Sequence, residues 1–317
     1  MSRKIIHIGL PKTATTLLQK FFFPTLCNIN KIKFLGKNSK GNSSDNKKIT
    51  YLKYSINYNF VPEKFKIDDD YIVSHEGLGP MDPAFWEVAS KKIKNTLGED
   101  STVLIVIRSP KNFLTSAYLE ECIGKGFFIR PERFFLKKDD YKLNENFPKF
   151  DIDNFDYELL KKYYSGNFSR VVFIKYENLF DKDYLLQALD IDNKETSDFI
   201  KKFQTRSNKS GSNKAISKKG VKILTKISKL LHRFGLKLGN YRENKTLEDF
   251  SRLLTEGKDT KKKIFQTSLL NLYRIYIDRY LFKEKFDLDF SVVLGDKLEN
   301  LEEKYKALKP IEIINKK

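Results

Sequence analysis

The N-terminal segment of the chain passes from an apolar run through a polar loop into an amphipathic stretch. The β-branched run at residues 5–8 is typical of a buried strand. Beyond the loop, apolar residues recur at helical spacing at Leu17, Leu18, Phe21 and Phe22. The pattern therefore predicts a strand and a helix joined by the polar loop at residues 11–16.

Further apolar runs predict more strands. Residues 103–107 form a continuous apolar run that ends at Arg108 and is followed by a turn at Pro110 and a helix. Residues 71–74 and residues 171–174 are shorter runs of the same kind. Such interleaving of apolar strands with helices predicts an α/β fold, with a central parallel sheet flanked by helices and a helical C-terminal portion.

The size and composition of the chain favour one large core. The 317 residues are 40% hydrophobic and include 26 Phe. We expect a single domain over residues 1–317, with its core at residues 1–205 and its helical portion at residues 206–317.

Several features bear on the cellular location. The chain has no run of about 18 apolar residues, and its N-terminus enters the first strand almost at once. Cys27 and Cys122 are far apart and give no disulfide framework. These features predict a cytoplasmic protein. The formal charge of +19 would attract anionic ligands, although it identifies none of them and could equally reflect genomic base composition.

The loop before the first helix carries the groups that an anion requires. Lys12, Thr13, Thr15 and Thr16 lie where a helix offers backbone N–H groups and the positive end of its dipole. The pattern differs from the nucleotide-triphosphatase loop GxxxxGK[ST], because alignment from Gly9 puts Ala14 at the second glycine and Thr15 at the lysine. The cation stands earlier, at Lys12.

A second candidate anion site follows the strand at residues 103–107. Arg108 would leave this strand at its carboxyl end, where ligands of open α/β sheets bind, and Ser116 would lie two turns into the next helix. Both side chains could then reach one phosphate, which a guanidinium grips in a bidentate way.

The two motifs resemble those of sulfotransferases that use 3′-phosphoadenosine-5′-phosphosulfate (PAPS). The loop PKTATT, at residues 11–16, is similar to the family's 5′-phosphosulfate loop, whose usual form is PKSGTT. The longer stretch HIGLPKTATTLLQ resembles bacterial sulfotransferases, many of them associated with surface carbohydrate. Arg108 and Ser116 have the spacing of the family's 3′-phosphate segment, and residues 171–182 are similar to its late core strand and YExL segment.

This resemblance implies a P-loop-like sheet and sulfuryl transfer from PAPS, leaving 3′-phosphoadenosine-5′-phosphate (PAP). The acceptor would be a hydroxyl, in preference to an amine, of a carbohydrate or glycolipid. Lys12 would neutralise the leaving oxygen, and the 5′-phosphate would be held by the loop Pro11, Lys12, Thr13, Ala14, Thr15 and Thr16. Arg108 and Ser116 would hold the 3′-phosphate. Arg206, Lys209 and Ser210 are further candidates for cofactor contacts, because they lie where the family returns a loop to the nucleotide.

A base must take the proton from the acceptor. Glu76 and His75 end the predicted strand at residues 71–74, and both can accept a proton. We prefer Glu76, which matches the position of the catalytic glutamate in several carbohydrate sulfotransferases. No cluster of His, Cys, Asp and Glu has metal-ligand spacing, so the prediction is a metal-independent enzyme.

Two other functions remain open. A nucleotide-dependent kinase would share the strand, loop and helix, but should carry a lysine at position 15 and carboxylates for magnesium. A basic module that binds a polyanion without catalysis would leave the spaced motifs unexplained. The amphipathic helix predicted at residues 218–237 could contact a membrane surface or pack on its own domain. No nucleic acid is expected as a partner, and the sequence leaves the oligomeric state open.

Overall fold

A computed structural model describes residues 3–10, 12–36, 44–57, 70–124, 131–137, 139–140, 148–191, 193–207 and 290–316. The chain groups into two compact units. The first comprises Met1–Phe113, Asp151–Gly211 and Asp296–Lys317, and the second comprises Leu114–Phe150 and Ser212–Gly295. Organisation as a single functional domain stays a prediction.

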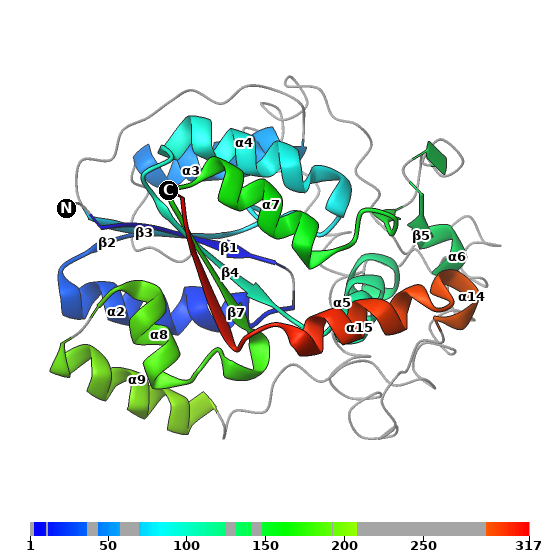
Figure 1. Ribbon diagram of the computed structural model, residues 1–317. Helices are drawn as coiled ribbons and strands as arrows, with labels where there is room; N and C mark the ends of the chain where they lie inside the picture. The colour runs from blue at the N-terminus through cyan, green and yellow to red at the C-terminus, as the bar shows by residue number, and fades with distance from the viewer. Residues whose placement is uncertain are drawn as a thin grey trace, which may run out of the picture. The chain divides into compact units, whose positions relative to one another are not determined.

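The first unit is built on a six-stranded sheet in the order β2-β3-β1-β4-β7-β8. Its strands are β1 (Lys4–Gly9), β2 (Lys33–Gly36), β3 (Tyr71–Glu76), β4 (Thr102–Ile107), β7 (Arg170–Lys175) and β8 (Ile311–Asn315). All neighbouring pairs are parallel except β7 and β8. The predicted α/β fold with a mostly parallel central sheet is therefore confirmed (Figure 1).

The sheet is covered by helices on both faces (Figure 1). One face carries α2 (Phe23–Asn30), α8 (Lys182–Leu189) and α9 (Lys194–Ser207), and the other carries α3 (Ser44–Asn57), α4 (Trp86–Leu97) and α7 (Tyr157–Asn167). On the first face, Ile5 and Leu104 pack in one buried cluster with Phe22 and Phe23. Ile6, the alternate residue of β1, is also fully buried, as expected for a strand covered on both sides.

Strand β1 occupies the centre of the sheet, between β3 and β4. From β1 the chain crosses to the edge strand β2 and returns through β3, and it then passes to the other side of β1 to form β4. This order reverses at β1. In open α/β sheets, ligands bind beyond the carboxyl ends of the strands at such a reversal. The loop that follows β1 stands at this point.

The C-terminal part of the first unit adds a helix and an edge strand to the sheet. Helix α15 (Lys297–Ala307) precedes β8, which pairs antiparallel with β7 so that Ile311 lies opposite Ile174. The only described residues of the predicted helical portion are 206–207 and 290–316. The predicted helix at residues 218–237 lies outside the described residues.

The second unit has its own aromatic cluster. Its described elements include α6 (Pro131–Phe134), the short strand β5 (Phe135–Leu136) and α14 (Ser291–Leu294). Ring centroids of Phe134 and Phe135 are 4.7 Å apart, and those of Phe135 and Phe290 are 5.7 Å apart. Among the residues described for both units, no helix is long and apolar enough to cross a membrane.

Candidate anion-binding site

The loop after β1 is held by two threonine hydroxyls. Thr13 Oγ1 donates to the carbonyl oxygen of Leu10 at 2.6 Å, and Thr15 Oγ1 donates to the same oxygen at 3.2 Å. Both side chains are buried. Because each hydroxyl has one proton to donate, these two residues shape the loop, and an anion would rely on the backbone N–H groups for donors.

Helix α1 (Thr15–Leu17) approaches β1 very closely. A Cβ atom on Gly9 would lie 2.4 Å from Cγ2 of Thr15, which is far inside van der Waals contact. A Cβ atom on Gly79 would lie 3.1 Å from the backbone nitrogen of Leu10, so the turn after β3 also packs against this loop. Glycine at position 9 leaves room for the Thr15 side chain, and glycine at position 79 lets its backbone approach that of Leu10. The helix continues through the π-helical segment Leu18–Phe22 into α2.

Two residues of the loop adopt the left-handed backbone conformation. Lys12 has φ 66° and Ala14 has φ 59°. This conformation is unfavourable for residues with a Cβ atom, and residues held in it cluster at functional sites. Glycine adopts it without steric cost, whereas Ala14 holds a Cβ atom in it.

The side chains of Lys12 and Thr16 are exposed, whereas those of Thr13 and Thr15 are buried. The exposed pair stands at the start of the continuous helix over residues 15–30. Backbone N–H groups at a helix start have no carbonyl partner within the helix, and the dipole is positive there. An ammonium and a hydroxyl are therefore presented where the backbone favours negative charge.

Arg108 comes directly after β4 and lies against this loop. Its Nη1 donates to the carbonyl oxygen of Lys12 at 3.4 Å, a long hydrogen bond. The guanidinium carbon lies 5.1 Å from the ring centroid of Tyr176, and the hydroxyl of Tyr157 donates to the carbonyl oxygen of Arg108 at 2.6 Å. The structure thus brings the predicted cation of the second motif beside the predicted cation of the first.

Ser116, the other residue of the second motif, is half-buried on helix α5 (Pro110–Tyr118). It belongs to the second compact unit, whereas Lys12 and Arg108 belong to the first. A shared phosphate site for Arg108 and Ser116 stays a prediction.

The two candidate bases end strand β3 beside the loop. The register pairs Gly9 with Glu76 and Ile8 with His75. Both residues therefore lie at the carboxyl end of β3, next to the end of β1 from which the loop departs. The His75 side chain is buried. Which of the two acts as the base stays a prediction.

Several predicted residues lie outside the described part of the chain. They are Pro11, Lys209 and Ser210 entirely, together with the side chains of Glu76 and Arg206.

Two tyrosines that lie against Arg108 were given no site role from the sequence. Tyr157 begins helix α7 after an N-cap at Asp156, and nothing in its local pattern distinguishes it from a core aromatic residue. Tyr176 follows β7 as Arg108 follows β4, in neighbouring parallel strands. That equivalence was a usable signal. Burial raises the pKa of Tyr157, so its hydroxyl stays protonated and keeps donating to Arg108.

His7 lies in β1 next to the continuous helix over residues 15–30, and it is part of the core. Its Nδ1 is 2.7 Å from Oγ of Ser74, and its ring centroid is 5.1 Å from that of Phe23. Burial lowers the pKa of His7 to about 3. The imidazole is therefore neutral near pH 7. Among the described residues, no three His, Cys, Asp or Glu side chains group so as to hold a metal ion.

Comparisons with known proteins give no family. No protein-family model matches the chain, and no curated protein shows significant similarity to it. Among solved structures, the genome packaging NTPase B204 from Sulfolobus turreted icosahedral virus 2, in complex with AMP, shows 11% identity, a TM-score of 0.16, and coverage of 63% of this chain and 87% of its own. So low a TM-score supports no argument about function. The α/β assignment rests on the sheet itself.

Proposed function

We propose that this chain is a PAPS-dependent sulfotransferase whose acceptor is a hydroxyl of a carbohydrate or glycolipid. The observation that carries the proposal is the hydrogen bond from Arg108 Nη1 to the Lys12 carbonyl. It joins two anion motifs that resemble, in sequence and order, those for the two ends of PAPS. Since β1 and β4 are adjacent and parallel, the loop after β1 and Arg108 after β4 leave the sheet at the same edge, which supports the proposal.

In this reaction the loop would bind the 5′-phosphate and neutralise the charge that develops on the departing oxygen. PAPS supplies an activated sulfuryl group, whose bond to the 5′-phosphate oxygen breaks while the acceptor oxygen bonds to sulfur. As in phosphoryl transfer, positioning and electrostatics would supply most of the acceleration. The Lys12 ammonium would stabilise charge on the departing oxygen. Loop N–H groups, with the exposed Thr16 hydroxyl, would hold the 5′-phosphate.

Glu76 would take the proton that the acceptor hydroxyl loses. Its position beside Gly9 in the register supports this role, because the loop that holds the sulfuryl group begins at that residue. His75 remains the alternative base. It is buried and paired in register with Ile8, so acting on the same acceptor would require a change in its surroundings.

The direct test is transfer of labelled sulfur from PAPS to a panel of glycans and glycolipids, with PAP binding measured by calorimetry. We expect transfer to at least one acceptor, and PAP binding that weakens in Arg108→Ala. If neither transfer nor PAP binding occurs, the proposal is wrong. Tight polyanion binding that falls steeply with salt and is unaffected by Lys12→Ala would favour the non-catalytic module instead.

A kinase would require a different residue at position 15 of the loop. A lysine at position 15 would reach the phosphates, but this chain has a buried threonine there, and its hydroxyl donates to Leu10. A magnesium-dependent rise in ATP affinity would favour the kinase over the sulfotransferase.

A further inference from the structure

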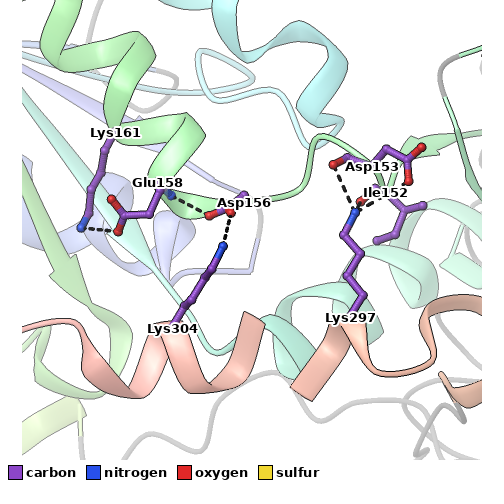
Figure 2. A network of polar contacts seen from close by, with 7 residues as sticks. All are labelled: Ile152, Asp153, Asp156, Glu158, Lys161, Lys297 and Lys304. Carbon is purple, nitrogen blue, oxygen red and sulfur yellow. Dashed lines mark hydrogen bonds and ion pairs between the residues drawn. The ribbon is translucent and has the colours of Figure 1, made fainter. Parts of the chain in front are cut away.

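Helix α15, far from the loop in sequence, is fastened to the segment that leads into α7. Lys304 Nζ contacts Asp156 Oδ2 at 2.8 Å, and Lys297 Nζ donates to the carbonyl oxygens of Ile152 at 2.7 Å and Asp153 at 3.1 Å (Figure 2). Asp156 also accepts the Glu158 N–H as the N-cap of α7. These contacts fix α15 beside the first turn of α7, which carries Tyr157.

The same helix is tied to the turns after β4 and β7. Glu302 accepts the backbone N–H of Lys111 at 2.6 Å, near Arg108 in sequence. The hydroxyl of Tyr305 donates to Oε2 of Glu177 at 2.5 Å. Glu177 follows Tyr176 directly in the turn Tyr176–Asn178. Helix α15 therefore contacts two turns. One follows β4 and bears Arg108, and the other follows β7 and bears the Tyr176 ring beside the guanidinium.

Tyr305 contacts Glu177 and Tyr157, and each of these residues constrains Arg108 by a separate route. Through Glu177 it holds the turn whose Tyr176 ring lies 5.1 Å from the guanidinium carbon. Its own ring centroid lies 6.1 Å from that of Tyr157, which donates to the Arg108 carbonyl. The route through Glu177 and Tyr176 acts on the guanidinium, and the route through Tyr157 acts on the Arg108 backbone. Burial and the Glu177 carboxylate raise the pKa of Tyr305, so its hydroxyl remains a donor at all working pH values.

We propose that Tyr305 is a positioning residue that pre-organises Arg108 for its anion, through the hydrogen bond to Glu177 and the contact with Tyr157. An unheld arginine would lose side-chain freedom on binding, and fixing the guanidinium beforehand removes part of that cost. This inference rests on the proposed function in one respect only, which is that PAP is the anion used to probe Arg108.

The first test needs no ligand. The side-chain Nε–H signal of Arg108 is identified by NMR as the signal lost in Arg108→Lys. In Tyr305→Phe, which keeps the ring but removes the hydroxyl, this signal should move and its order parameter should fall. Tyr71→Phe is the matched control, because Tyr71 is also buried and its hydroxyl contacts Ser101 at 3.2 Å near the amino end of β3. An Arg108 signal unchanged in Tyr305→Phe would overturn the proposal.

The second test uses PAP as the probe. Since hydrogen bonds to charged groups carry more energy than neutral ones, Tyr305→Phe should weaken PAP binding roughly five-fold, and Tyr71→Phe should leave it unchanged. In an Arg108→Lys background the effect of Tyr305→Phe should largely vanish, because the two changes act on one contact. Equal effects in both backgrounds would refute positioning. An absence of PAP binding in the unchanged protein would instead refute the proposed function, and the NMR result would still decide the positioning role.

Discussion

The left-handed conformation of Ala14 is the most specific constraint at the residue scale. We expect Ala14→Gly to stabilise the protein by about 0.5–1 kcal/mol, because glycine has no steric cost at φ 59° and is a better N-cap than alanine. Thermal or denaturant unfolding measures this. The control is Ala188→Gly, at a buried position in the last turn of α8, where the same change should destabilise the protein. Destabilisation by Ala14→Gly would contradict the loop conformation.

Substitutions of Lys12 and Arg108 should change different kinetic constants, although the two residues are neighbours. Under the proposed function, Lys12→Ala should chiefly lower kcat, about 100-fold or more, because its ammonium would stabilise charge that develops only in the transition state. Arg108→Ala should chiefly raise the KM for PAPS, by about ten-fold or more, because the 3′-phosphate keeps its charge throughout the reaction. Steady-state kinetics with each variant measure both constants. Near-normal kinetics for both would show that the site lies elsewhere.

Single residues also show how far sequence reasoning reaches. The places of Lys12 and Arg108 beyond the ends of β1 and β4 were predictable, because each follows an apolar run, whereas their roles stay predictions. The inward roles of Thr13 and Thr15 were not, because a hydroxyl near a helix start can bond to an anion or to a nearby carbonyl with the same local sequence. Only the folded turn, which places the Leu10 carbonyl within reach, decides between them.

At the scale of elements, the close approach of α1 to β1 should make Gly9 sensitive. Gly9→Ala should destabilise the protein by about 1–3 kcal/mol and weaken PAP binding, because the added Cβ must displace Thr15 and the loop with it. The matched control is Gly166→Ala in α7, where a Cβ would meet nothing within 4 Å. That change should stabilise the protein by about 0.5 kcal/mol. Unfolding curves and PAP titrations of both variants test the pair, and a harmless Gly9→Ala would refute the close approach.

The parallel strands were predictable as elements, whereas β8 and the role of α15 were not. Strands β1 and β4 are buried on both faces and show as continuous apolar runs. Strand β8 is a half-buried edge strand, so its sequence carries a weaker pattern. The ties from α15 to Asp156 and Glu177 join residues 148 and 128 positions apart in the chain. Local periodicity contains no information about such long-range contacts.

At the scale of the whole molecule, one buried base, His7, makes the stability of the folded protein depend on pH. His7 sits in β1 at the centre of the sheet, and its pKa falls from 6.5 to about 3 on burial. Between these values the unfolded chain binds a proton that the folded chain does not, so stability falls as the pH falls. The loss begins below about pH 6.5 and is complete near pH 3. At pH 5 it should amount to roughly 2 kcal/mol.

The effect of His7 is isolated by comparison with His7→Gln, which cannot titrate in this range. Urea unfolding of both proteins at pH 7 and pH 5 gives the free energy of unfolding, and other groups that titrate contribute equally to each. The unchanged protein should lose about 2 kcal/mol more than the variant. The neutral His7 contacts Ser74 and Phe23, and Phe23 belongs to the continuous helix that follows the candidate anion-binding loop. If the two proteins lost stability equally, His7 would have to be protonated in the folded state, and the packing of that helix on β1 would be wrong.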